Sequence, residues 1–253
     1  MGGALARAAA RVSGAEIRLS DHNIDKCSSL AEQIGAEVTD NIGVAENSEI
    51  IFLAVKPNII GAVAGEIKDT VNKRNTTVVT MAAGVQISKL ESILGDRQPI
   101  IRIMPNTPCQ VGEGMILWCK NAAVSNKQGA DFCTALSCAG ELMTIDENKI
   151  DAASAISGCG PAFVYMFIDA LATGGVAAGL TREVAQKLAV KTAIGASEMI
   201  RQTAKHPDIL KDEVCSPGGS TIEGVLTLEN GAFRSTVSDA VISSYEKTKK
   251  LGK

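Results

Sequence analysis

The chain has 253 residues, of which 45% are hydrophobic and 21% charged, a balance that excludes a disordered chain or a fibre and predicts one or two globular domains. Its 25 Lys and Arg residues are nearly balanced by 28 Asp and Glu residues, and only 3% of residues are aromatic, so we expect no nucleic-acid partner. The seven Cys residues include no C-x-x-C pair and no His/Cys cluster, which predicts reduced thiols in a cytoplasmic protein, without a disulfide framework or a metal site.

Short β-rich runs alternate with helical patterns up to about residue 145. The strands are expected at residues 15–19, 49–55, 76–80 and 99–104. The helices between them are expected at residues 25–34, 57–69 and 88–94, and the second begins with Pro57, a residue that suits a helix start. This alternation predicts a Rossmann-like doubly wound parallel sheet, an α/β fold with helices on both faces.

From about residue 149 the strand-like runs end and long Ala-rich helical patterns begin. Helices are expected at residues 161–178, 182–204, 220–230 and 232–250. Thr181 precedes the second of them as a predicted N-cap. We therefore predict a dinucleotide-binding domain over residues 1–147 and an all-helical domain for substrate binding and dimerisation over residues 148–253.

The helix predicted after Pro161 has almost no polar face. A helix that is apolar all round needs cover on every side, which predicts a homo-oligomer, a dimer or a multiple of dimers, built through these helices. The alternative is that the helices bury one another within a monomer. Residues 152–168 are the longest uncharged stretch of this half, and Gly and Pro interrupt it, so we expect no membrane span.

The chain opens with a helical pattern that has Gly2 at its start, and a predicted strand ends at Ser20 and Asp21. A dinucleotide-binding unit has its ribose-side residue at about this distance after its last glycine. The strand and the first two glycines of that motif are missing before Gly2, and no signal peptide pattern is seen. We therefore expect Met1 to be an internal Met of a longer natural chain.

Two Gly-rich segments stand directly before predicted helices, at residues 157–162 and 215–221. Free backbone N–H groups at a helix start attract anions, and glycines let a ligand approach the backbone closely, so each segment is a candidate site for a carboxylate or a phosphate. The alternative is that both are ordinary turns between helices, with Ser or Thr as a cap.

Several segments, taken in order, resemble the pyrroline-5-carboxylate reductase family over nearly the whole chain. They are residues 55–57 (V-K-P), 81–85 (M-A-A-G-V), 102–108 (R-I-M-P-N-T-P), 157–162 (S-G-C-G-P-A) and 206–222, which includes C-S-P-G-G-S-T-I. The resemblance implies a Rossmann domain, a helical dimerisation domain and reduction of 1-pyrroline-5-carboxylate to proline, the last step of proline synthesis. It implies NADPH as the cofactor, with NADH as the alternative because Asp21 suits a free ribose hydroxyl.

The resemblance also implies roles for individual residues. The cofactor would be bound by Gly2, Ser20, Asn41, Ala54, Val55, Lys56, Pro57, Met81, Ala82 and Ala83. The substrate would be bound by Glu147, Ser216, Gly218, Gly219, Ser220 and Thr221. Hydride transfer to a C=N bond needs little acid–base machinery, so the hydroxyl of Thr221 is the one expected catalytic group, which orients the imine or relays its proton.

Two rival functions stay open. One is a related dehydrogenase acting on a hydroxy acid, although the Gly-rich helix starts contain no Lys or His base for it. The other is a catalytically impaired, oligomeric dinucleotide-binding protein. Oxidation of NAD(P)H with and without the pyrroline substrate separates the three.

Overall fold

The computed structural model describes residues 1–251, which form two compact units. The first, called the sheet unit, contains Met1–Gly158 together with the described residues that follow Ser243. The second, called the helical unit, contains Cys159–Ser243. The functional division that we predict between residues 147 and 148 stays a prediction.

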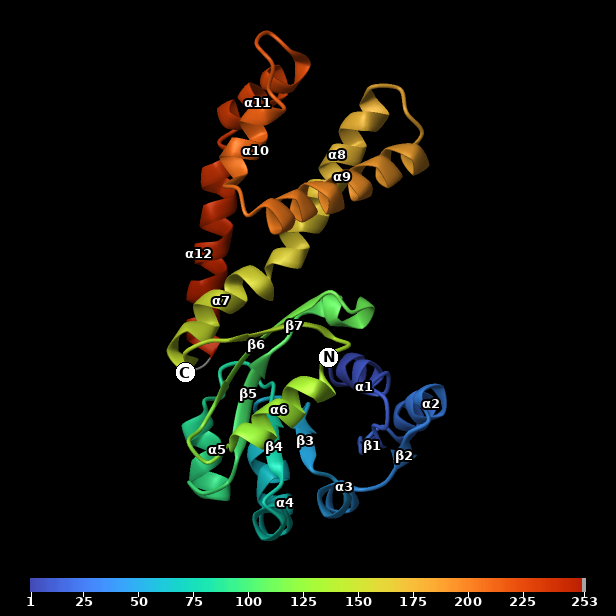
Figure 1. The fold of residues 1–253 in the computed structure, drawn as a ribbon, viewed down its shortest axis with the longest axis vertical. Coiled ribbons are helices and arrows are strands. Elements are labelled where there is room, and N and C mark those ends of the chain that lie inside the picture. Colours follow the sequence, from blue (N-terminus) through green and yellow to red (C-terminus); the bar gives the residue numbers. More distant parts are fainter. Residues whose placement is uncertain (252–253) are drawn as a thin grey trace. The chain divides into compact units, whose positions relative to one another are not determined.

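The described strands all lie in the sheet unit (Figure 1). They are β1 (Arg18–Leu19), β2 (Glu37–Val38), β3 (Ile50–Leu53), β4 (Thr77–Thr80), β5 (Ile100–Met104), β6 (Gly114–Lys120) and β7 (Gly140–Thr144). The main sheet has the order β3-β4-β5-β6-β7, with β3, β4 and β5 parallel, β6 antiparallel to β5, and β7 parallel to β6. β1 and β2 form a separate parallel pair.

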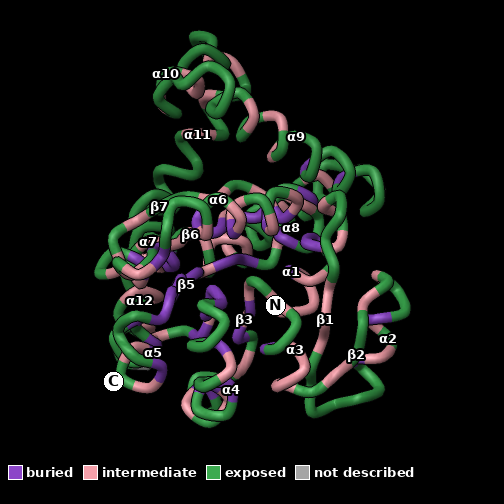
Figure 2. Tube along the Cα trace, turned by 60° about the horizontal axis from the view of Figure 1, so that its bottom comes forward, coloured by how far each residue is buried: buried purple, intermediate pink, exposed green. Residues whose placement is uncertain are grey.

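Helices cover both faces of the main sheet. The helices of the first 158 residues are α1 (Gly2–Ala9), α2 (Ile24–Ile34), α3 (Asn41–Asn47), α4 (Ile60–Arg74), α5 (Ile87–Leu94), α6 (Asn126–Ala135) and α7 (Ile150–Ser157), with the short 3-10 helices η1 (Thr107–Val111) and η2 (Glu147–Lys149). Of these, α2 packs against β2 of the separate strand pair. Side chains alternate along β4, so that Val78 joins the core under α4 and α5 while Val79 joins the core under α1 and α6. Figure 2 shows β5, in the middle of the main sheet, as buried. The predicted Rossmann-like doubly wound sheet is therefore confirmed.

The helical unit buries little of its apolar surface. It contains α8 (Gly160–Ala177), α9 (Arg182–Thr203), α10 (Pro207–Glu213), α11 (Ser220–Asn230) and the start of α12 (Phe233–Leu251). α8 packs on α9 through the small buried residues Ala172, Ala185 and Ala189. Met166 is 73% exposed, and Figure 2 draws most of α10 and α11 as exposed. An apolar surface of this kind marks an interaction site.

One helical run is long and apolar enough to cross a membrane, by length and composition alone. It covers residues 147–177, and its most apolar window has a mean hydropathy of 1.5 and is 11% buried. This differs from our expectation for residues 152–168, because the turn at Gly158 and Cys159 separates α7 from α8 by two residues only. The test is weak evidence for a membrane, since an uncovered subunit interface passes it too.

Most predicted elements are confirmed, with local corrections. The strands predicted at 49–55, 76–80 and 99–104 are β3, β4 and β5, whereas the one at 15–19 shortens to β1. The helix expected to start at Pro57 starts at Ile60, because the preceding turn closes through a bond from the Ile59 N–H to the Lys56 carbonyl. The sequence patterns missed β2, β6, β7, α3, α6, α7 and α10.

From Ile150 to Leu251 the described residues form helices joined by turns, as predicted. Thr181 is the N-cap of α9, and its hydroxyl oxygen accepts from the Val184 N–H at 3.4 Å. The last helix begins at Phe233, one residue later than expected, because Ala232 has a left-handed backbone with φ of 55°.

Candidate functional site

The start of α1 packs against the end of β3. A Cβ atom placed on Gly2 would lie 2.7 Å from the Cβ of Ala54, so only glycine allows this close approach. Met1, the N-cap of α1, provides no side-chain bond to the helix start, and no described residue accepts from the N–H of Gly2 or Gly3. These free donors, together with the helix dipole, suit a phosphate group.

Two predicted cofactor residues from distant parts of the chain are hydrogen-bonded to each other. Ser20 follows β1 and donates from its hydroxyl to Oδ1 of Asn41, the first residue of α3, at 2.8 Å. The Asn41 amide in turn donates to Oε2 of Glu66 at 2.8 Å. Asp21, the residue after Ser20, accepts from the N–H of Asn23 at 2.9 Å. The arrangement offers hydroxyl, amide and carboxylate groups to a sugar hydroxyl.

The remaining predicted cofactor residues follow two neighbouring parallel strands. Leu53 at the end of β3 pairs with Thr80 at the end of β4, so residues 54–57 and 81–83 leave the sheet side by side. Ala82 is buried and its N–H donates to the Thr80 hydroxyl at 3.3 Å, whereas Lys56 is exposed. Ligands of open parallel sheets bind beyond the carboxyl ends of the strands, which is where these residues lie.

A buried arginine, which the sequence reasoning did not single out, organises the other predicted residue of the sheet unit. Arg102 on β5 is 2% exposed and donates to Oε1 of Glu147 and to Oδ1 of Asp151, both at 3.2 Å. The same Oε1 accepts from the Ile87 N–H at 2.7 Å. An arginine inside the apolar run I-I-R-I-M was the available sequence signal.

Cys119 lies opposite Arg102 in the β5–β6 register. Burial, reinforced by the nearby charge of Glu147, raises the pKa of the Cys119 thiol to about 11. The thiol is therefore protonated at neutral pH and is not a nucleophile.

In the helical unit, the second Gly-rich segment is an exposed turn that leads into α11. Gly218 has a φ of 68°, a left-handed conformation that favours glycine, and the N–H of Gly219 closes the turn onto the Ser216 carbonyl at 3.0 Å. Gly219 is the N-cap of α11 and provides no side-chain bond. No described residue accepts from the N–H of Ser220 or Thr221, and their hydroxyls are exposed. We call residues 216–221 the cradle loop.

Ion pairs hold the helices on both sides of the cradle loop. Arg234 near the start of α12 bonds to Asp208 of α10 at 2.9 Å and to Glu229 of α11 at 2.6 Å. The hydrogen bond from Arg234, supported by Lys211, lowers the pKa of the Asp208 carboxyl. These pairs join α12 to the first turn of α10 and to the last turn of α11, while the N–H groups of Ser220 and Thr221 stay free.

The first Gly-rich segment does not form one exposed turn of this kind. Ser157 ends α7, and its carbonyl accepts from the Asn106 side chain at 2.8 Å. A Cβ atom on Gly158 would lie 2.8 Å from the Ser154 carbonyl oxygen. Packing within the sheet unit therefore requires glycine at position 158, whether or not a ligand binds there.

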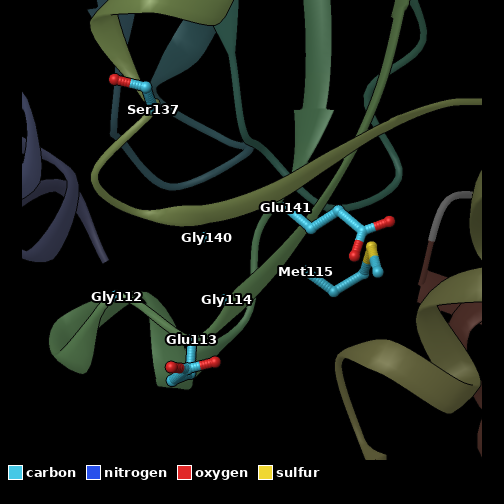
Figure 3. Close-up of a pocket in the computed structure, with 7 residues that line it drawn as sticks. All are labelled: Gly112, Glu113, Gly114, Met115, Ser137, Gly140 and Glu141. Atoms are coloured by element: carbon cyan, nitrogen blue, oxygen red, sulfur yellow. The ribbon is translucent and has the colours of Figure 1, made fainter. Parts of the chain in front are cut away.

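The sheet unit also has an open hollow of about 430 Å³ away from the predicted site residues (Figure 3). It is lined by Gly112, Glu113, Gly114, Met115, Ser137, Gly140 and Glu141. The Glu141 and Met115 side chains reach toward the same space in Figure 3. The lining offers carboxylates and no cation, so it does not suit an acidic substrate.

Both halves of the chain match models of known protein families. Residues 147–251 match a family model described as pyrroline-5-carboxylate reductase dimerisation, and residues 1–84 match one described as NADP oxidoreductase coenzyme F420-dependent. The chain is 42% identical over 230 residues to pyrroline-5-carboxylate reductase of Escherichia coli K12, covering 90% of this chain and 85% of that protein. The Arabidopsis thaliana enzyme of that name is 39% identical over 82% of this chain and 75% of its own length.

Two solved structures are also similar. The Plasmodium falciparum pyrroline carboxylate reductase with NADP bound has a TM-score of 0.86 and 35% identity, covering 100% of this chain and 95% of that one. The pyrroline-5-carboxylate reductase of Coxiella burnetii has a TM-score of 0.90 and 30% identity, covering 100% and 94%.

Proposed function

The chain belongs to the pyrroline-5-carboxylate reductase family, and we propose from this premise that it reduces 1-pyrroline-5-carboxylate to proline with NADPH, the last step of proline synthesis. The observation that carries the proposal is the cradle loop, an exposed turn in which the N–H groups of Ser220 and Thr221 have no partner among the described residues. A small ring acid has one carboxylate that suits these donors.

NADPH fits the residues of the sheet unit. The free N–H groups of Gly2 and Gly3 at the start of α1 would bind the pyrophosphate, and Ser20 with Asn41 would face the adenosine ribose. Ala54, Val55, Lys56, Pro57, Met81, Ala82 and Ala83 would lie along the rest of the cofactor. When bound, NADPH supplies the hydride that reduces the C=N bond. The Plasmodium falciparum relative with NADP bound supports NADPH over NADH.

The cradle loop would hold and orient the substrate. N–H groups of Ser220 and Thr221 and the Ser216 hydroxyl would donate to the ring carboxylate. Gly218 would let the carboxylate approach the backbone, and Gly219 leaves the room that the Ser216 side chain needs beside it. The Thr221 hydroxyl would hold the protonated ring nitrogen in place, since a hydroxyl both donates and accepts. Orientation of this kind supplies several kcal/mol, up to about 7–11 in favourable cases.

Glu147 has a narrower role in this proposal. Its Oε1 is used by Ile87 and Arg102, so Oε2 is the oxygen that a substrate would meet. The Glu147 side chain is 30% exposed, which leaves this oxygen access to a ligand.

The helical unit supports a homo-oligomer. Its match to a dimerisation model and its exposed apolar side chains, such as Met166 on α8, favour a dimer or a multiple of dimers through these helices. Subunit contacts would also cover the apolar run at residues 147–177. We further propose a cytoplasmic location and no nucleic-acid or membrane partner, as the composition predicts.

An assay that measures both products of the reaction tests the function. The purified chain is mixed with NADPH or NADH, with and without 1-pyrroline-5-carboxylate, and both cofactor oxidation and proline formation are measured. We expect equal amounts of NADPH oxidised and proline formed, at a rate higher than with NADH. Cofactor oxidation with a 2-keto acid, and not with the pyrroline, would favour the rival function of a hydroxy-acid dehydrogenase. Cofactor binding without turnover would favour a catalytically impaired dinucleotide-binding protein.

A further inference from the structure

Arg102 is a buried charge in the middle of an apolar strand. Its side chain is 2% exposed, and it is flanked on β5 by Ile101 and Ile103, which are fully buried. Its Nε finds no acceptor among the described residues. A hydrophobic residue in this place would avoid the cost of removing a charge from water, so the arginine calls for an explanation beyond packing.

One arm of the Arg102 network reaches the loop after β4. Oε1 of Glu147 accepts from Arg102 and also from the N–H of Ile87, the first residue of α5. Ile87 directly follows residues 81–86, which include three predicted cofactor contacts and which we call the cofactor loop. The bonds within that loop join residues close in sequence: the Ala82 N–H donates to the Thr80 hydroxyl, and the Val85 N–H donates to the Ala82 carbonyl. The Glu147 carboxylate therefore fixes the far end of the loop.

The other arm of the network reaches α7. Nη2 of Arg102 donates to Oδ1 of Asp151 in the first turn of that helix. α7 is also held at its other end by the bond from Asn106 to the Ser157 carbonyl, and by the buried Ile150 and Ala155. The helix therefore has support that does not depend on Asp151, whereas no other described side chain holds the Ile87 N–H.

We propose that Arg102 is a positioning residue for the reduction, because it fixes Glu147 and through Glu147 the cofactor loop. The inference rests on the proposed function in so far as this loop holds NADPH. Without the guanidinium, the partly exposed Glu147 carboxylate turns toward water, and the Ile87 N–H loses its acceptor. The loop then has to be ordered again whenever the cofactor binds.

Two variants of the full chain separate the two arms. Arg102→Met removes both arms, and the matched control Asp151→Asn removes only the α7 arm. Each is compared with the unaltered chain by hydrogen exchange of a peptide that contains Ile87, by the Kd for NADPH without substrate, and by steady-state kinetics.

For Arg102→Met we expect hydrogen exchange at Ile87 and the Kd for NADPH to rise about tenfold, and the KM for the pyrroline to rise as well, because Glu147 no longer presents Oε2 to the substrate. We expect kcat to fall about 10- to 100-fold, since a small displacement of bound reactants is costly. Asp151→Asn lowers the melting temperature and leaves exchange at Ile87 and the Kd unchanged. Arg102→Lys, which keeps the charge, recovers part of the NADPH affinity.

The inference is overturned if Arg102→Met and Asp151→Asn have the same Kd and the same exchange at Ile87. If Arg102→Met does not fold, Glu147→Ala removes the loop arm alone, and an unchanged Kd for NADPH in that variant overturns the inference equally. Failure of the proposed function is distinct, because the unaltered chain would then form no proline while the exchange at Ile87 still reports on the network.

Discussion

Replacing Gly219 by alanine perturbs the cradle loop with a single methyl group. Gly219 has a φ of −81°, which any residue adopts, so the backbone itself tolerates alanine. The added Cβ would collide with the hydroxyl of Ser216 and lie 3.2 Å from the Ser216 carbonyl oxygen. The Ser216 side chain must therefore rotate away or the turn must open.

The size of the effect follows from the bond that is lost. A hydrogen bond between the Ser216 hydroxyl and a carboxylate is a bond to a charged group, worth about 1.5–3 kcal/mol. Its loss corresponds to a decrease of about 10- to 100-fold in kcat/KM for the pyrroline. Alanine is also a poorer N-cap than glycine, which costs α11 up to about 1 kcal/mol of stability.

The matched control for Gly219→Ala is Gly224→Ala, in the middle of the same helix. A Cβ atom on Gly224 would meet nothing within 4 Å, so this variant stabilises α11 by about 0.5–1 kcal/mol and leaves kinetics unchanged. Initial rates are measured against both substrates at a temperature where both variants are folded. Equal kcat/KM for Gly219→Ala and Gly224→Ala would refute the assignment of the cradle loop to the substrate.

Four further predictions concern separate parts of the chain. Thr221→Ala lowers kcat at least about tenfold while Thr221→Ser keeps most of it, in the same rate assay, and equal rates for the two would remove the hydroxyl from the mechanism. Met166→Glu places a charge on an apolar side chain that is 73% exposed, so light scattering should show a smaller assembly than for the unaltered chain. The thiol of Cys119, with its pKa raised to about 11, stays unmodified by a thiol reagent at pH 8 in the folded chain, and peptide mapping that finds it modified would contradict its burial. Hydrogen bonds from Arg201 and Gln202 lower the pKa of Glu198 from 4.5 to about 2. The Glu198 carboxylate therefore stabilises the fold above pH 4.5, and this contribution is lost as the pH falls from 4.5 to about 2. Glu198→Gln should remove this part of the dependence of the melting temperature on acid pH.

The sequence patterns predicted the elements that repeat a simple period. β3, β4 and β5 are apolar runs that alternate with helical patterns along the chain, and this alternation was enough to locate them. β6 was missed because only the short η1 separates it from β5, and it runs antiparallel, which breaks the strand–helix rhythm. β7 was missed because it is partly exposed and carries Glu141.

The candidate site was predictable where it depends on local backbone chemistry. The free N–H groups of the cradle loop follow from glycines directly before a helix, and the contact of Ser20 with Asn41 joins two residues that the family resemblance had already named. The Arg102 network was not predictable, because its carboxylate partners lie 45 and 49 residues away in the chain. Only the fold brings them to one place.

The central claim, that the cradle loop holds a small ring acid by its carboxylate, is tested most directly by a crystal structure of the chain with NADP and proline. We predict that the proline carboxylate accepts hydrogen bonds of about 2.7–3.2 Å from the N–H groups of Ser220 and Thr221. A well-ordered proline bound elsewhere, with residues 216–221 making no contact to it, would contradict the account.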